Sequence, residues 1–163
     1  MKPIEGTVFK YGDHINTDLI IQTAHLSDDR NEMGKYCLVN LDPNFPKNVK
    51  QGDILVAGYN FGCGSTKAAS QALLGAGIVC VVAKSFGRIF FRNAINSGLL
   101  VIESKEFVDS IETNERARID FDNGYCENLY NGVRIPIPPY PPFIKKIIEC
   151  GGIINMIKIY GIE

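Results

Sequence analysis

The sequence predicts an α/β protein built around a parallel sheet, and three features of residues 53–102 carry that prediction. Short, continuous apolar runs are typical of strands covered on both faces. A helical pattern follows each of the first two runs, and a third apolar run closes the segment. This alternation indicates parallel pairing through helical crossovers. The expected strands are 53–57, 78–83 and 99–102, and the expected helices are 68–74 and about 86–97.

The segments on either side predict smaller elements. Residues 4–11 alternate and indicate a strand, while residues 13–35 are expected to form a long loop with a short helix. Two later runs flank an Asp-Asn-Gly turn, which is a hairpin signal. The proline-rich residues 136–142 predict a stiff, extended connector, with an SH3-type ligand as the alternative. The hairpin strands are expected at 116–121 and 126–130, and two final helices at 143–150 and 153–160.

Composition indicates one globular domain spanning residues 1–163. Hydrophobic residues make up 45% of the chain and charged residues 21%. The net charge of -1 argues against a nucleic-acid partner or a polybasic membrane surface. The N-terminus lacks the apolar core of a signal peptide, and no apolar run approaches the roughly 20 residues of a membrane span. We therefore expect a soluble, cytoplasmic protein.

Cysteine and histidine are too sparse to predict a metal or disulfide site. The five cysteines form no C-x-x-C pair, and their odd number argues against a disulfide framework. No zinc or iron–sulfur site is expected in this chain alone. A Ser-His-Asp triad needs His14 or His25, and neither lies near a nucleophile-elbow motif.

The most informative stretch is residues 58–67, G-Y-N-F-G-C-G-S-T-K. Gly62 and Gly64 permit unusual backbone angles and close approach of a ligand. Ser65 or Thr66 is the expected N-cap of the following helix. A helix N-terminus favours anions, and Lys67 adds a cation. The alternative is a tight turn before a helix without a ligand. The spacing does not match a Walker P-loop.

Three stretches together resemble one family. They are G-D-H-I-N-T-D-L-I-I at 12–21, N-F-G-C-G-S at 60–65, and A-K-S-F-G-R-I-F-F-R-N-A-I-N-S-G-L at 83–99. In this order they resemble the small subunit of 3-isopropylmalate dehydratase and its homoaconitase, citramalate and dimethylmalate relatives. The resemblance covers residues 4–103 well. It implies the swivelling β/β/α domain that forms the last domain of aconitase.

The resemblance also implies a site shared between two chains. A separate large subunit is expected to carry a [4Fe–4S] cluster, which acts as a Lewis acid, and this chain is expected to hold no cofactor. Ser65 matches the serine that removes a proton as an alkoxide, and Thr66 and Lys67 match positions that bind a substrate carboxylate. His25, Leu26 and Ser27 match the positions that recognise the variable group of the hydroxy acid.

The chain departs from the family pattern near this site. The family usually has S-S-R-E-[HQ]-A where this chain has Ser-Thr-Lys-Ala-Ala-Ser at 65–70. Lysine keeps the charge of arginine but loses its planar fork. The segment 20–26 also lacks the proline and arginine of the family. These changes fit a changed substrate (citramalate, dimethylmalate or homoaconitate), a non-catalytic module, or retained isopropylmalate activity.

We therefore predict a hydro-lyase small subunit of leucine biosynthesis that is active only with its large partner. The isolated chain is expected to be inactive, to contain no iron, and to be able to form a homo-oligomer. A non-catalytic swivelling module predicts that loss of the Ser65 hydroxyl changes nothing. A stand-alone anion- or nucleotide-binding domain predicts phosphate binding without any partner.

Overall fold

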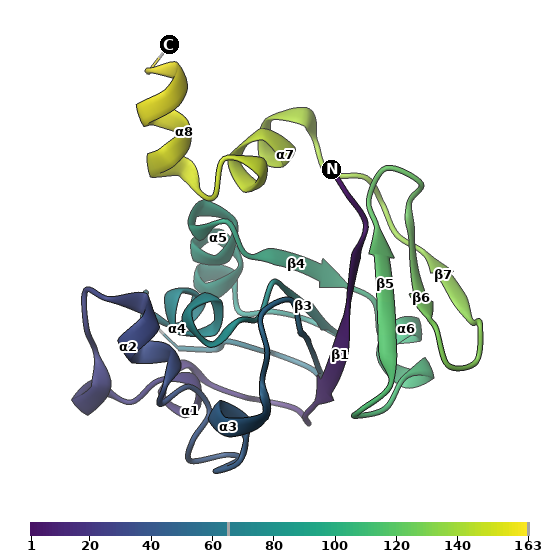
Figure 1. The fold of residues 1–163 in the computed structure, drawn as a ribbon, viewed down its shortest axis with the longest axis horizontal. Helices are drawn as coiled ribbons and strands as arrows, with labels where there is room; N and C mark the ends of the chain where they lie inside the picture. The colour runs from purple at the N-terminus through teal and green to yellow at the C-terminus, as the bar shows by residue number, and fades with distance from the viewer. Residues whose placement is uncertain (65, 163) are drawn as a thin grey trace.

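A computed structural model of the chain, which describes residues 1–64 and 66–162, contains one seven-stranded sheet of order β4-β3-β2-β1-β5-β6-β7 (Figure 1). Its left half in Figure 1 is parallel and its right half antiparallel. The first strand joins the halves, because it runs parallel to β2 and antiparallel to β5. The strands are β1 (Ile4–Lys10), β2 (Ile54–Ala57), β3 (Cys80–Ala83), β4 (Leu100–Glu103), β5 (Arg116–Asp120), β6 (Tyr125–Asn128) and β7 (Arg134–Pro136).

Helices cover both faces of the sheet and extend beyond it. The helices are α1 (Thr17–Ile20), α2 (Arg30–Gly34), α3 (Phe45–Asn48), α4 (Ala69–Ala76), α5 (Arg88–Ser97), α6 (Lys105–Ser110), α7 (Pro142–Glu149) and α8 (Ile153–Tyr160), with a 3-10 turn at Thr23–His25. In Figure 1, α1 to α5 gather on the side of the parallel strands, and α6 lies beside the antiparallel ones. No helix in the described ranges has the length and hydrophobicity that a membrane crossing requires.

The predicted alternation of strands and helices is confirmed in β2, α4, β3, α5 and β4. The hairpin is also confirmed, since β5 and β6 pair antiparallel across the Asp-Asn-Gly turn. The N-cap prediction is wrong for Thr66, because α4 begins at Ala69 and its N-cap is Ala68, which makes no side-chain cap. A turn at residues 67–68 separates Thr66 from the helix. Ser65, the other predicted cap, lies outside the described residues.

Successive side chains of the buried strands point to opposite faces of the sheet, and this divides the interior into two cores. Leu55 and Val81 face the core beneath α4 and α5, whereas Ile54 and Val82 face the core that includes α6. All residues of β2 and β3 are buried, as their continuous apolar runs predict for strands covered on both faces. The α6 helix, which the sequence analysis did not predict, is the cover on the second face.

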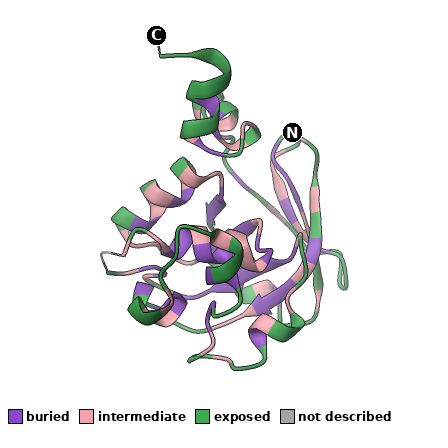
Figure 2. Ribbon diagram, turned by 60° about the vertical axis from the view of Figure 1, so that its left-hand side comes forward, coloured by how far each residue is buried: buried purple, intermediate pink, exposed green. Residues whose placement is uncertain are grey.

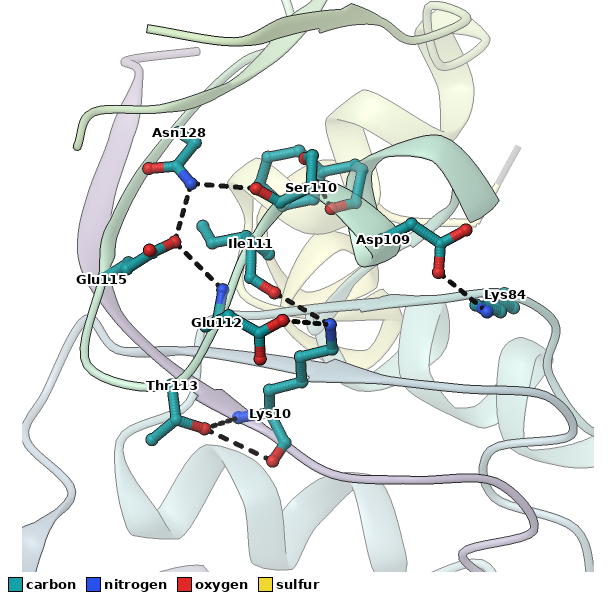
Figure 3. A network of polar contacts seen from close by, with 10 residues as sticks. Lys10, Lys84, Asp109, Ser110, Ile111, Glu112, Thr113, Glu115 and Asn128 are labelled. Atoms are coloured by element: carbon teal, nitrogen blue, oxygen red, sulfur yellow. Dashed lines mark hydrogen bonds and ion pairs between the residues drawn. The ribbon is translucent and has the colours of Figure 1, made fainter. Parts of the chain in front are cut away.

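A polar network holds α6 and its following loop against the sheet (Figure 3). Lys10 Nζ donates to the Ile111 carbonyl at 2.9 Å and pairs with Glu112 at 3.3 Å. On the antiparallel side, the buried Asn128 amide donates to the Ser110 carbonyl at 3.0 Å. At the end of β3, Lys84 Nζ lies 2.9 Å from Asp109 Oδ1. These contacts connect α6 to strands from both halves of the sheet.

The Lys84–Asp109 pair gives a pH-dependent contribution to stability. The hydrogen bond from Lys84 lowers the pKa of Asp109 below its usual value of 3.8. A depressed carboxyl pKa stabilises the fold above the unfolded pKa, and that contribution is lost as pH falls through the folded pKa. We expect wild type to exceed Asp109→Asn in free energy of unfolding at about pH 6, and the gap to close below about pH 3. Urea titrations of both proteins across this pH range test the prediction. A difference in free energy of unfolding that does not change with pH contradicts it.

The proline-rich connector and the last two helices form an appendage to the sheet. Tyr140 donates its hydroxyl to the Val101 carbonyl and stacks on Phe121 with ring centroids 4.9 Å apart. Beyond it, Figure 2 shows α8 projecting from the body with mainly exposed residues. Met156 is the buried residue of α8, while Ile154 and Ile159 are exposed. The connector is therefore docked on the sheet, and α8 contributes little to the core.

Candidate active site

The three stretches that carry the family resemblance meet at the carboxyl end of the parallel strands. The loop after β2 lies between the segment after β1 and the segment after β3. On one side, Gly62 N–H donates to the Ile15 carbonyl at 2.7 Å, and Thr17 N–H donates to the Cys63 carbonyl at 2.9 Å. On the other, Gly87 N–H donates to the Phe61 carbonyl at 2.9 Å. Ligands of open α/β sheets commonly bind at this end.

Both glycines of the loop occupy positions that other residues fit poorly. Gly62 has φ 78°, and a Cβ there would lie 2.2 Å from Phe90 Cγ. Gly64 has φ 116°, and a Cβ would lie 2.6 Å from Thr17 Oγ1. Asn60 shares the left-handed region with φ 59° despite its side chain. Left-handed backbone at non-glycine residues tends to cluster at functional sites.

Aromatic rings support the loop from beneath. Phe61 is 1% exposed and makes an edge contact with Phe90 at 5.2 Å between centroids. Phe86 stacks on Phe90 at 6.1 Å. The backbone of Asn60 is also fixed, because its N–H donates to Ser85 Oγ at 2.7 Å. The glycine-rich turn therefore rests on a rigid base formed by the start of α5.

The structure brings some predicted site residues together and leaves others apart. An open pocket of about 500 Å³ contains both Lys67 and Ser27. Thr66 is half-buried beside Lys67 in sequence. His25 stacks on Tyr36 with centroids 3.8 Å apart, and Leu26 is 45% exposed; neither lines this pocket. Ser65, the predicted catalytic residue, lies outside the described residues, so its role stays a prediction.

Residues outside the predicted site complete the pocket. Arg30 begins α2, and Gln71 lies in the first turn of α4. No motif marks Arg30, which lies within the segment 13–35 that is predicted to form a long loop with a short helix. The loop leading to it is ordered by local bonds: Asp29 N–H donates to Ser27 Oγ at 3.1 Å, and Asp29 Oδ1 accepts from Asn31 N–H at 2.9 Å. The pocket wall combines polar and charged side chains with the apolar residues Met33 and Ala68.

Cysteines near the site do not assemble into a metal centre. Within residues 1–64 and 66–162, no group of three or more His, Cys, Asp or Glu side chains is placed to hold a metal ion. Burial raises the pKa of the Cys126 thiol to about 12 and also raises the pKa values of Cys37 and Cys80, which favours inert packing. Cys63 is half-buried within the glycine-rich turn, where its carbonyl accepts from Thr17.

Comparison with known proteins identifies the family. The family model described as the aconitase C-terminal domain matches residues 14–107. A 3-isopropylmalate dehydratase small subunit from Caldanaerobacter subterraneus is 47% identical over 157 residues, which cover 95% of this chain and 98% of the relative. The chain belongs to the family of 3-isopropylmalate dehydratase small subunits. A family member from Helicobacter hepaticus is 46% identical, with 94% of each chain covered.

A solved structure places the fold in the same family. The crystal structure of 3-isopropylmalate dehydratase from Methanocaldococcus jannaschii matches with a TM-score of 0.90 and 39% identity. The match covers 97% of this chain and 95% of that one. The α/β swivelling domain predicted from the sequence is therefore confirmed for this member of the small-subunit family.

Proposed function

We propose that the chain is the small subunit of a two-chain hydro-lyase that acts on 3-isopropylmalate in leucine biosynthesis. The observation that carries the proposal is the meeting of the three family stretches at one end of the sheet, beside the pocket of Lys67 and Ser27. The names of relatives matched over nearly their whole length support the substrate class. The expected reaction removes water from a hydroxy-dicarboxylic acid and adds it back.

Residues of this chain would move the proton and hold the acid. We assign Ser65 as the base that takes the proton next to a carboxylate, because it matches the family serine in the glycine-rich turn. A serine oxygen is a weak base in water, so it needs donors and cations directed at it. Thr66 and Lys67 are assigned to a substrate carboxylate. Lys67 is exposed in the pocket wall, where it can meet an anion.

The partner is proposed to be a large subunit that carries a [4Fe–4S] cluster. The small-subunit names of the relatives support a separate large partner. When bound, the cluster supplies a Lewis acid to the substrate. The pocket of the small subunit is open, so we expect the large subunit to close it and exclude water. We place the assembly in the cytoplasm.

The side-group positions also admit a second candidate substrate. We assign His25, Leu26 and Ser27 to the variable group of the acid. Ser27 places a hydroxyl in the wall of a pocket that also contains the apolar residues Met33 and Ala68. A hydroxyl at this position suits a paralogue acting on citramalate, dimethylmalate or homoaconitate as well as one acting on 3-isopropylmalate.

Reconstitution with the large subunit of the same organism tests both candidates. We expect anaerobic turnover of isopropylmalate, citramalate, dimethylmalate or homoaconitate only when both chains are present, and the preferred acid identifies the substrate. Each chain alone is the control, and gel filtration of the isolated small subunit reports whether it forms a homo-oligomer. A stable two-chain complex without turnover of any of these acids would contradict the enzyme assignment and support a non-catalytic module.

A further inference from the structure

The pocket beside Lys67 contains a second cation that no family motif marks. Arg30 begins α2 and lines the same pocket of about 500 Å³ as Lys67 and Gln71. Asp28 is the carboxylate of the pocket, so two cations oppose one acid. The lining therefore carries a net positive charge, which suits an anion with more than one oxygen.

The backbone of Arg30 packs directly against the helix that follows Lys67. The Arg30 carbonyl lies so close to α4 that a Cβ at Gly75 would be 1.7 Å from its oxygen. A Cβ at Gly34, on the last residue of α2, would be 2.3 Å from the Gly75 carbonyl carbon. The backbones of α2 and α4 are therefore in direct contact at these two glycines.

The Arg30 side chain is available to a ligand. Among the residues that the structure describes, no carboxylate lies within 4.0 Å of its guanidinium. The carboxylate of Asp29 is directed to the backbone instead, where it accepts from Asn31 N–H at 2.9 Å. A half-buried arginine that has no carboxylate partner among the described residues, on the wall of a pocket, is suited to bind an anion.

The chemistry of the two cations differs in a way that makes them complementary. Lys67 is a compact point charge, and it cannot grip both oxygens of a carboxylate in a planar fork. The guanidinium of Arg30 can do so. We propose that Arg30 binds one carboxylate of the substrate together with Lys67, so that α2 supplies the fork that position 67 lacks. This inference rests on the proposed hydro-lyase function.

Kinetics of the two-chain enzyme test the assignment. Arg30→Ala should raise KM about 10- to 100-fold, with a smaller change in kcat, because it removes the binding free energy of a hydrogen-bonded charge pair. Adding Lys67→Arg to Arg30→Ala should restore most of the lost affinity. The double variant again has a planar guanidinium in the pocket, now at position 67. Lys35→Ala is the matched control: it removes one positive charge from the exposed residue after α2, which pairs with Glu32.

The outcomes separate this inference from the proposed function. An unchanged KM in Arg30→Ala, with turnover that still needs both chains, overturns the role of Arg30 alone. A raised KM that Lys67→Arg does not restore also overturns it, since it points to a structural effect of the substitution. If the complex turns over none of the acids, calorimetry with malate decides: equal affinity of wild type and Arg30→Ala overturns the inference, and weaker binding by the variant supports it.

Discussion

Replacing Ser65 by alanine is expected to lower kcat of the two-chain enzyme by about 10²–10⁴-fold, the range that a positioned proton-transfer group contributes. The methyl group that remains cannot accept a proton, whereas Lys67 and Thr66 are unchanged and should still bind the acid. We therefore expect KM to change much less than kcat. Anaerobic initial rates over a range of substrate concentrations, with the reconstituted complex, measure both parameters.

A serine outside the three family stretches controls for the loss of a hydroxyl. Ser110→Ala removes a hydroxyl that donates to the Phe107 carbonyl at 2.8 Å in α6, and it should leave kcat unchanged. Co-purification with the large subunit checks that Ser65→Ala still assembles. Full turnover by an assembled Ser65→Ala complex would show that another group carries the proton, and it would favour the non-catalytic interpretation of the glycine-rich turn.

Gly75→Ala is expected to destabilise the protein by about 1–3 kcal/mol, the usual cost of overpacking. Alanine is normally the better residue inside a helix, by about 1 kcal/mol, so propensity alone predicts the opposite sign. Here the added methyl group would meet the Arg30 carbonyl at 1.7 Å, and backbone cannot rotate away as a flexible side chain can. The first turn of α2 must move, and the wall of the pocket beside Lys67 moves with it.

Thermal unfolding and kinetics together check the Gly75 prediction. Each kcal/mol should lower Tm by roughly 2–4 °C for a chain of this size. Because Arg30 shifts, KM should rise as well. Gly12→Ala is the control, since a Cβ there meets nothing within 4 Å and the backbone angle is ordinary. A Tm equal to or above that of wild type for Gly75→Ala would mean that α2 can separate from α4 without loss.

The parallel half of the fold was predictable because its signals are local. Continuous apolar runs over β2 and β3, each followed by a helical pattern, leave few alternatives, and Gly98 ends α5 in the left-handed conformation. By contrast, α6 and β7 are short, and their apolar residues are too few to give a period. They are stabilised by distant partners such as Ser110 with Asn128, which a local pattern does not reveal.

The site was predictable where a motif existed and not elsewhere. The resemblance selected Lys67 and Ser27, which the structure brings into one pocket. It also selected His25, but stacking on Tyr36 holds that ring away from the pocket lining. Arg30 reaches the pocket only because Gly34 and Gly75 let two helices touch. A contact between glycines distant in sequence leaves no periodic signal, so sequence reasoning could not find it.

Because β1 pairs with both β2 and β5, its pairing is completed only late in synthesis of the chain. Glu5 on β1 pairs with Arg118 on β5, 113 residues later, so one edge of the central strand stays open until most of the chain has been synthesised. An open strand edge is a template for pairing with other chains. Such long-range pairing also slows folding. We therefore expect nascent or truncated chains that end before Arg116 to aggregate through the edge of β1.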